Sequence, residues 1–175
     1  ETTASKYSGK KAVVCNSATD LSYLPNSSID FIFTDPPFGA NINYSEMNIL
    51  WESWLKEFTD ATDEAIINRA QGKKLDEYED LIASSLTECY RVLRPGHWML
   101  LVFMNSAGNV WGALKSAVQR AGFLTERLDI FDKQHGTFKQ FVSENTAGCD
   151  LVLHCRKPSS KKAKRIDEKA LTCEE

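Results

Sequence analysis

Apolar and polar positions along this chain follow two different periods, and these predict strands and helices in alternation. Short apolar runs bounded by polar or turn-forming residues predict strands, and apolar positions spaced by three or four residues predict amphipathic helices. The apolar runs are KAVVC at 11–15, IDFIFT at 29–34, HWMLLVFM at 97–104, and the segments 124–131 and 149–155. Helical stripes fall in 47–55, 78–93 and 110–121, and we expect a further, exposed helix within 58–77.

Helices that alternate with apolar strands predict an α/β fold with a mainly parallel sheet. The continuous apolar run at 97–104 is typical of a central strand covered on both faces. The last two predicted strands are separated by a polar loop without a helical pattern, so we expect them to form an antiparallel pair at one edge. Gly122 is placed to cap the helix that precedes this pair.

The stripe at 47–55 carries two tryptophans, Trp51 and Trp54, at helical spacing with Met47, Leu50 and Leu55. A stripe of this kind is more often part of a core than a surface for stacking a base. We therefore expect both tryptophans to be buried.

Composition indicates one soluble domain, since the chain has 175 residues, of which 42% are apolar and 26% are charged. No apolar run is long enough to cross a membrane, and the polar residues 1–11 contain no secretory signal. The five cysteines are odd in number and form no CxxC pair. This pattern favours a reducing, cytoplasmic setting and gives no indication of a metal site.

Charge is uneven along the chain. The net charge of −3 counts mildly against binding of DNA by this chain alone. Six lysines and arginines gather in 156–165, which we interpret as the start of a solvated tail over 158–175. Basic residues, among them His135, alternate with phenylalanines in 133–148, a pattern that fits either an ordinary loop or contact with a single strand.

The most specific signal is the tetrapeptide Asp35-Pro36-Pro37-Phe38, directly after the strand expected at 29–34. Proline cannot donate to a sheet ladder, so the strand has to end there. Ligands of open α/β sheets bind outside the carboxyl ends of strands, which is where the motif falls. Each proline fixes its own φ and holds the residue before it extended, so the Pro36 carbonyl is oriented before any ligand arrives.

These residue types suit the methylation of an exocyclic amine, whose lone pair is delocalised into the base. A carboxylate such as Asp35 is a strong acceptor for the N–H groups of that amine, and the Pro36 carbonyl offers a second acceptor. Phe38 offers a flat face for stacking, and a base inside a duplex would have to be flipped out to reach it. The alternative is a rigid turn in which Asp35 is a cap and Phe38 belongs to the core.

With these residues considered, 11–157 resembles the amino-group DNA methyltransferases, which act on N6 of adenine or N4 of cytosine. The similar segments are VVCNSATDLSYLPNSSIDFIFTDPPF, ECYRVLRPGHWMLLVF and CDLVLHCRK. The resemblance implies a Rossmann-like methyltransferase sheet, S-adenosyl-L-methionine as cofactor and DNA as partner, with the target base flipped from the duplex. It also raises a restriction or defence partner as a possibility.

Carried over residue by residue, the resemblance makes Asp35, Pro36, Pro37 and Phe38 the catalytic residues. Cofactor contacts would come from Asn16, Ser17, Asp20 and Thr34. Gly39, Asn43 and Tyr44 follow the motif within one loop and are the expected substrate contacts, although Asn43 and Tyr44 could instead order the loop. Asp20 is equally well explained as a helix N-cap.

Two departures from the family pattern limit the expectation. The family usually has Gly-Asp where this chain has Asn16-Ser17, and its Gly-rich FxGxG cofactor turn is absent. We therefore expect a catalytic-region fragment whose cofactor turn lies elsewhere in a longer enzyme. Adenine N6 is the expected target, because Asp is commoner in the adenine enzymes of the family. An RNA guanine-N2 methyltransferase and a non-catalytic methyltransferase-like binding module stay open as alternatives.

Overall fold

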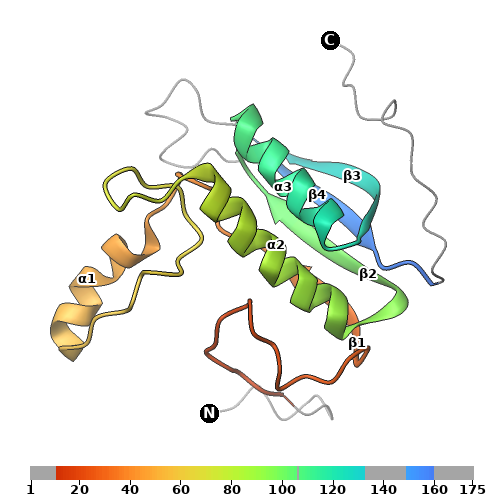
Figure 1. The fold of residues 1–175 in the computed structure, drawn as a ribbon, viewed down its shortest axis with the longest axis horizontal. Coiled ribbons are helices and arrows are strands. Elements are labelled where there is room, and N and C mark those ends of the chain that lie inside the picture. The colour runs from red at the N-terminus through yellow and green to blue at the C-terminus, as the bar shows by residue number, and fades with distance from the viewer. Residues whose placement is uncertain (1–10, 106, 133–148, 160–175) are drawn as a thin grey trace.

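The described strands form one four-stranded sheet in the computed structural model, which describes residues 11–105, 107–132 and 149–159 (Figure 1). The strands are β1 (Ile29–Thr34), β2 (Leu93–Phe103), β3 (Leu124–Asp132) and β4 (Cys149–Arg156), in the order β1-β2-β4-β3. β1 is parallel to β2, while β4 is antiparallel to both β2 and β3. β1, β2 and β3 therefore point the same way, and the predicted antiparallel pair at one edge is confirmed.

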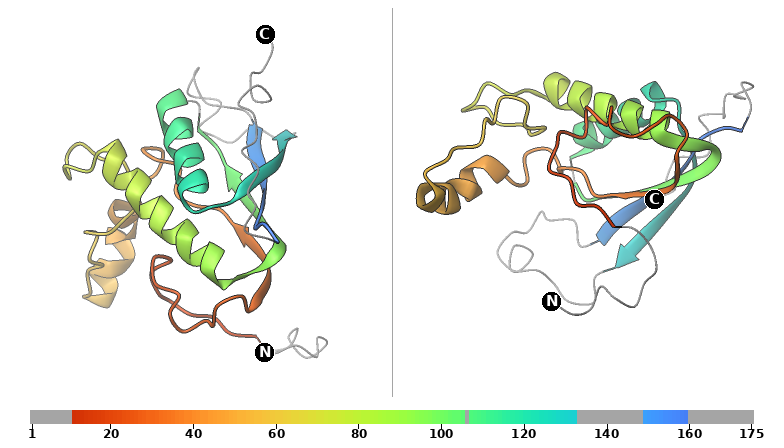
Figure 2. Two further views of the ribbon diagram at one scale, coloured as in Figure 1. Left: turned by 45° about the vertical axis from the view of Figure 1, so that its right-hand side comes forward. Right: turned by 90° about the horizontal axis from the view of Figure 1, so that it is seen from below.

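Two helices, α2 (Leu75–Val92) and α3 (Gly108–Arg120), lie together on one face of this sheet (Figure 2). Their buried side chains meet those of β2 and β4 in a single core. Its largest members include Tyr78, Leu86, Leu114, Met99, Leu101 and Phe103. The opposite face carries Phe31 and Phe33 of β1, which are 52% and 65% exposed. Within the described residues, the helical layer thus covers one side of the sheet.

Helix α1 (Tyr44–Leu55) was expected in the core, but it lies apart from the sheet (Figure 1). None of its residues is buried, and Trp51 and Trp54 are 68% and 83% exposed. The prediction of a helix is confirmed and that of two buried tryptophans is wrong, because helical spacing defines a stripe but not the surface that covers it. No helix among the described residues is long and apolar enough to span a membrane.

Two predicted elements are absent. Residues 11–15 form no strand, and the Val13 side chain is fully exposed; an apolar run becomes a strand only beside a partner, and the described neighbour of β1 is β2. No helix forms between 58 and 74. There the Asn68 side chain accepts hydrogen bonds from the backbone N–H groups of Ala70 and Gln71, and such bonds compete with helix formation.

A buried lysine, Lys157, fixes the end of the helical layer to the sheet. Its side chain is only 8% exposed, and its Nζ donates to the carbonyls of Tyr90 and Leu93, each at 2.6 Å. The same ammonium lies 4.6 Å from the centre of the Tyr90 ring. A cation at a helix C-terminus satisfies carbonyls that have no partner within the helix.

Replacing this cap should destabilise the fold. Lys157→Met keeps the aliphatic stem but leaves buried carbonyls without their donor, so the free energy of unfolding should fall by about 2 kcal/mol. Urea denaturation followed by circular dichroism measures the change. Lys115→Met on α3 is the control and should shift stability by less than about 0.5 kcal/mol. Equal stability of the two variants would contradict the capping role.

Candidate functional site at the carboxyl end of β1

The loop that follows β1 is held through its carbonyl oxygens. The Tyr78 hydroxyl of α2 donates to the Pro37 carbonyl at 2.7 Å, and the Asn105 side chain, just beyond β2, donates to the Phe38 carbonyl at 2.8 Å. Burial raises the pKa of Tyr78, so its hydroxyl keeps its proton and remains a donor. No residue of the described ranges donates to the Pro36 carbonyl. That carbonyl is therefore available to a ligand in an otherwise anchored loop.

Gly39 completes the loop in a conformation that favours glycine. Its φ is +69°, and a Cβ placed there would lie 3.0 Å from Cγ1 of Val110 and 3.3 Å from Cδ1 of Ile67. The Gly39 carbonyl also accepts a hydrogen bond from the backbone N–H of Ile67 at 3.2 Å. The residue is buried. Its contacts explain why the chain turns here, and contact with a substrate stays a prediction.

The Phe38 side chain is half-buried and faces the core. Its ring meets Phe103 of β2 edge-on, with centroids 5.3 Å apart and planes at 88°. Phe103 in turn lies 5.7 Å from the Trp111 ring of α3. This packing matches the alternative in which Phe38 is a core residue, and contact with a base stays a prediction.

A cavity of about 300 Å³ opens beside the motif. Five of the predicted site residues line it, namely Ser17, Thr34, Asp35, Pro36 and Pro37. The remaining lining residues, for which no site role was predicted, are Ala18, Thr19, Asp63, Ala65, Leu81, Ile82, Ser85, Leu86 and Cys89. The volume lies at the lower end of the range for small-molecule sites.

The lining combines two carboxylates, from Asp35 and Asp63, with hydroxyl groups and an apolar wall supplied by α2. Such a cavity suits an amphiphilic ligand that carries a positive charge. Leu81, Ile82, Leu86 and Cys89 belong to the apolar stripe that predicted α2, so that stripe was their signal in the sequence. Nothing comparable pointed to Asp63, which lies where a helix was expected. No three potential metal ligands cluster anywhere in the described ranges.

Asn16 and Asp20, which were predicted near the cofactor, build a turn beside the cavity. The Asn16 side chain donates to the Asp20 carbonyl at 3.0 Å, and the Asp20 carboxylate accepts from the Ser22 N–H at 2.9 Å. Hydrogen bonds from Ser22 lower the pKa of Asp20. Asp20 thus caps a turn, although the expected cap was that of a helix. The neighbouring Ser17 hydroxyl shares a hydrogen bond of 2.8 Å with that of Thr19.

Asn43 and Tyr44, predicted near the substrate, lie at the start of α1. Asn43 occupies the N-cap position, and its side chain donates to the Glu46 carboxylate at 3.2 Å. The pKa of Tyr44 is raised by partial burial and then by the carboxylates of Asp35 and Glu64. The charge of Asp35 therefore acts on the Tyr44 phenol, which links Tyr44 to the motif.

An ion pair on α2 holds the turn that contains Ser17. The Glu88 carboxylate accepts from the Leu21 N–H at 2.9 Å and from Arg91 at 2.8 Å. Arg91 in turn donates to the carbonyls of Leu21 and Leu24 at 2.8 and 2.9 Å. Both the donor and the acceptor of Leu21 are thus satisfied by one helix, which fixes this wall of the cavity against α2.

Comparison with solved structures identifies the fold. The chain is similar to the PvuII DNA methyltransferase, which is specific for cytosine N4, with 14% identity over 79% of this chain and a TM-score of 0.53. It is also similar to a Thermus thermophilus protein described as a DNA modification methylase, with 15% identity over 85% of this chain and a TM-score of 0.50. No protein-family model and no curated protein sequence matches the chain.

The chain covers 46% and 55% of these two structures, so it spans about half of their length. At such low identity the similarity shows the fold alone. The fold is a Rossmann-like α/β sheet of the kind found in these two structures. The expected antiparallel pair is present, and one of the three strand pairings is parallel.

The hydrogen bond from Tyr78 to the loop can be tested by removing one atom. Tyr78→Phe deletes the hydroxyl and leaves the Pro37 carbonyl without its donor, so the free energy of unfolding should fall by about 1 to 2 kcal/mol. Thermal unfolding measures the change. Tyr23→Phe is the matched control, because Tyr23 is 50% exposed, and it should behave as wild type. Wild-type stability in Tyr78→Phe would show that this hydrogen bond does not hold the loop.

The Glu88 ion pair predicts a dependence of stability on acid. The hydrogen bonds from Arg91 and Leu21 lower the pKa of Glu88 from 4.5 to about 2. A carboxyl group with a lowered folded pKa stabilises the fold above its unfolded pKa, and this contribution is lost as the pH falls from about 4.5 to about 2. In urea denaturation, the free energy of unfolding of Glu88→Gln should therefore vary less with pH across this window. Glu57→Gln should leave the profile unchanged, and an unchanged profile in Glu88→Gln would contradict the assignment.

Proposed function

We propose that residues 11–157 are the catalytic region of an S-adenosylmethionine-dependent DNA methyltransferase that modifies an exocyclic amine, most specifically N6 of adenine. One observation carries this proposal. The Asp35 carboxylate is followed by the Pro36 carbonyl, which accepts no hydrogen bond from the described residues, and both residues line a cavity at the carboxyl end of β1. The fold shared with two DNA methyltransferase structures supports it.

In the proposed reaction, the target amine donates its two N–H groups to the Asp35 carboxylate and the Pro36 carbonyl. Acceptors in this arrangement favour a tetrahedral nitrogen, whose lone pair is then free to attack. The hydrogen bonds to Pro37 and Phe38 keep the acceptors in place before the substrate binds, and preorganisation of this kind lowers the barrier. The proton released from nitrogen is taken up by Asp35 or by solvent.

The cavity beside the motif is the proposed location of part of the cofactor, which supplies an activated methyl group when bound. The residues present fit a cationic, amphiphilic group, since Asp35 and Asp63 offer negative charge and α2 offers an apolar wall. Ser17 and Thr34 would contact it directly. Asn16 and Asp20 would act indirectly, by holding the turn that presents Ser17.

The target base is proposed to reach the motif flipped out of the DNA duplex. Phe38 would contact it while its ring packs edge-on against Phe103, and Asn43 and Tyr44 would border it from the start of α1. Gly39 would contribute by letting the chain turn after the motif, at its positive φ. Adenine is proposed over cytosine on the Asp of the motif. The cysteine usage and the family resemblance suggest the cytoplasm and a restriction or defence partner.

Methyl transfer by the intact protein tests the proposal. Asp35→Asn should lower kcat by at least about 100-fold, because a charged acceptor at the reacting amine is lost. Tritiated S-adenosylmethionine and duplex DNA, followed by digestion to nucleosides, measure the rate and identify the base. Asp30→Asn is the matched control: it lies at the other end of the same strand in an ion pair with Arg94, and it should keep wild-type activity.

The labelled product distinguishes the alternatives. Tritium in N6-methyladenine supports the proposal in full, and tritium in N4-methylcytosine would correct the base but keep the enzyme class. Label in guanine when RNA replaces the duplex, with none in DNA, would favour the RNA methyltransferase. Absence of transfer and of cofactor binding in calorimetry would favour a non-catalytic module.

A further inference from the structure

Arg69 differs from the other arginines that the structure describes. Five of the six described arginines form ion pairs with carboxylates, and Arg69 forms none. The paired residues are Arg91, Arg94, Arg120, Arg127 and Arg156. Arg69 is also exposed. A guanidinium in water without a carboxylate partner is free to bind an anion.

The turn that carries Arg69 is well formed. Asn68 and Lys73 pair as an antiparallel bridge, and Gly72, with a φ of +71°, closes the turn between them. The Glu46 carboxylate of α1 accepts from the Asn68 side chain at 3.0 Å and from that of Gln71 at 3.4 Å. The Asn68 and Gln71 side chains thus hold the Glu46 carboxylate to the turn.

A hydrogen bond joins this turn to the loop that follows β1. The Ile67 N–H donates to the Gly39 carbonyl at 3.2 Å, and Arg69 follows only two residues later. Two residues of extended chain span at most about 7 Å. The backbone of Arg69 therefore lies close to the loop that begins with Asp35, and its long side chain reaches further.

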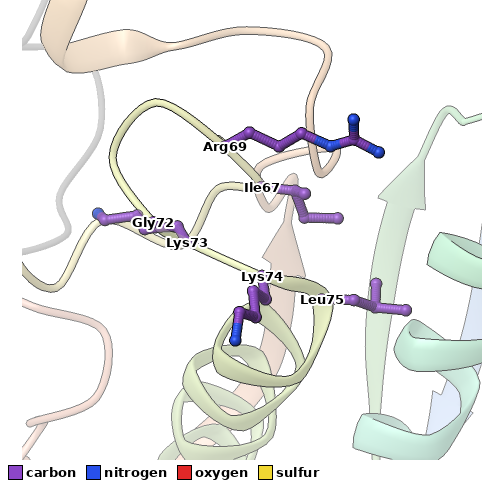
Figure 3. A pocket seen from close by; sticks show the side chains of 6 residues that line it. All are labelled: Ile67, Arg69, Gly72, Lys73, Lys74 and Leu75. Carbon is purple, nitrogen blue, oxygen red and sulfur yellow. The ribbon is translucent and has the colours of Figure 1, made fainter.

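A second cavity, again of about 300 Å³, lies at this turn and is lined by residues 67, 69 and 72–75. Figure 3 shows the side chains of Ile67, Arg69 and Leu75 extending to the same side. The Lys73 ammonium is already engaged, since it donates to the carbonyls of Ala61 and, at 2.9 Å, Glu64. Arg69 is thus the arginine that faces an apolar floor formed by Ile67 and Leu75.

We propose that Arg69 binds a phosphodiester of the DNA strand next to the flipped base, with the adjoining sugar against Ile67 and Leu75. The inference rests on the proposed function and names a contact that positions the strand. A guanidinium matches a phosphate through paired N–H donors, and an apolar floor accepts the sugar that joins one phosphate to the next.

Binding of DNA at increasing salt tests this contact without requiring catalysis. Fluorescence anisotropy of the intact protein with a labelled duplex, from about 50 to about 200 mM NaCl, gives affinity and its salt dependence. Arg69→Ala should bind several-fold more weakly at low salt, and the slope of log affinity against log salt should become shallower by about 0.9. Arg69→Lys should keep most of the slope because it keeps the charge. Arg94→Ala removes the same charge at the far end of β2 and should match wild type.

Each outcome decides the matter. A folded Arg69→Ala protein with wild-type affinity and slope overturns the contact, as does an equal loss in Arg94→Ala. If wild type binds and methylates DNA while Arg69→Ala keeps the slope, only the contact is wrong and the proposed function stands. If Asp35→Asn keeps DNA affinity while Arg69→Ala loses it, the contact is supported independently of catalysis. Absence of DNA binding by wild type would overturn both.

Discussion

The two prolines after β1 have no N–H groups, and this shortage of donors determines how the site is built. A loop that can mainly accept hydrogen bonds has to be held by donors from other parts of the chain. Tyr78 reaches it from α2 and Asn105 from beyond β2. The position of the motif therefore depends on the packing of helix against sheet. A change in that packing would also move the candidate site.

The elements that were predicted correctly are those that pack against another layer of the fold. β1, β2, α2 and α3 each pack against a neighbour in one core, so their apolar periodicity has a direct physical cause. The same periodicity failed where that neighbour is absent from the described residues. Residues 11–15 form no strand, and α1 forms a helix whose apolar side chains stay exposed. The loop at 133–148 and the tail beyond 159 lie outside the described residues.

The site was predictable only as far as its motif. Asp35 to Phe38 are adjacent in sequence, and the stiffness of proline is a local property, so both could be recognised without a structure. Asp63 reaches the same cavity through the fold, from a segment that forms neither helix nor strand although a helix was expected there. The turn with Ser17 is fixed by Glu88, 67 residues away from the Leu21 N–H that it binds. Long-range contacts of this kind leave no spacing in the sequence from which they could be inferred.

The local distribution of charge also depends on contacts that the sequence does not reveal. A net charge of −3 argued mildly against DNA as a partner, yet net charge counts every residue equally, whereas a phosphate senses only the cations near it and their freedom from carboxylates. Most arginines that the structure describes are neutralised by neighbours and contribute little to an outside anion. Arg69 combines three properties that a sum over the sequence cannot express, namely exposure, the absence of an ion-pair partner, and nearness to the loop of Asp35. Local placement of charge, and not its total, therefore decides whether such a surface can hold a nucleic acid.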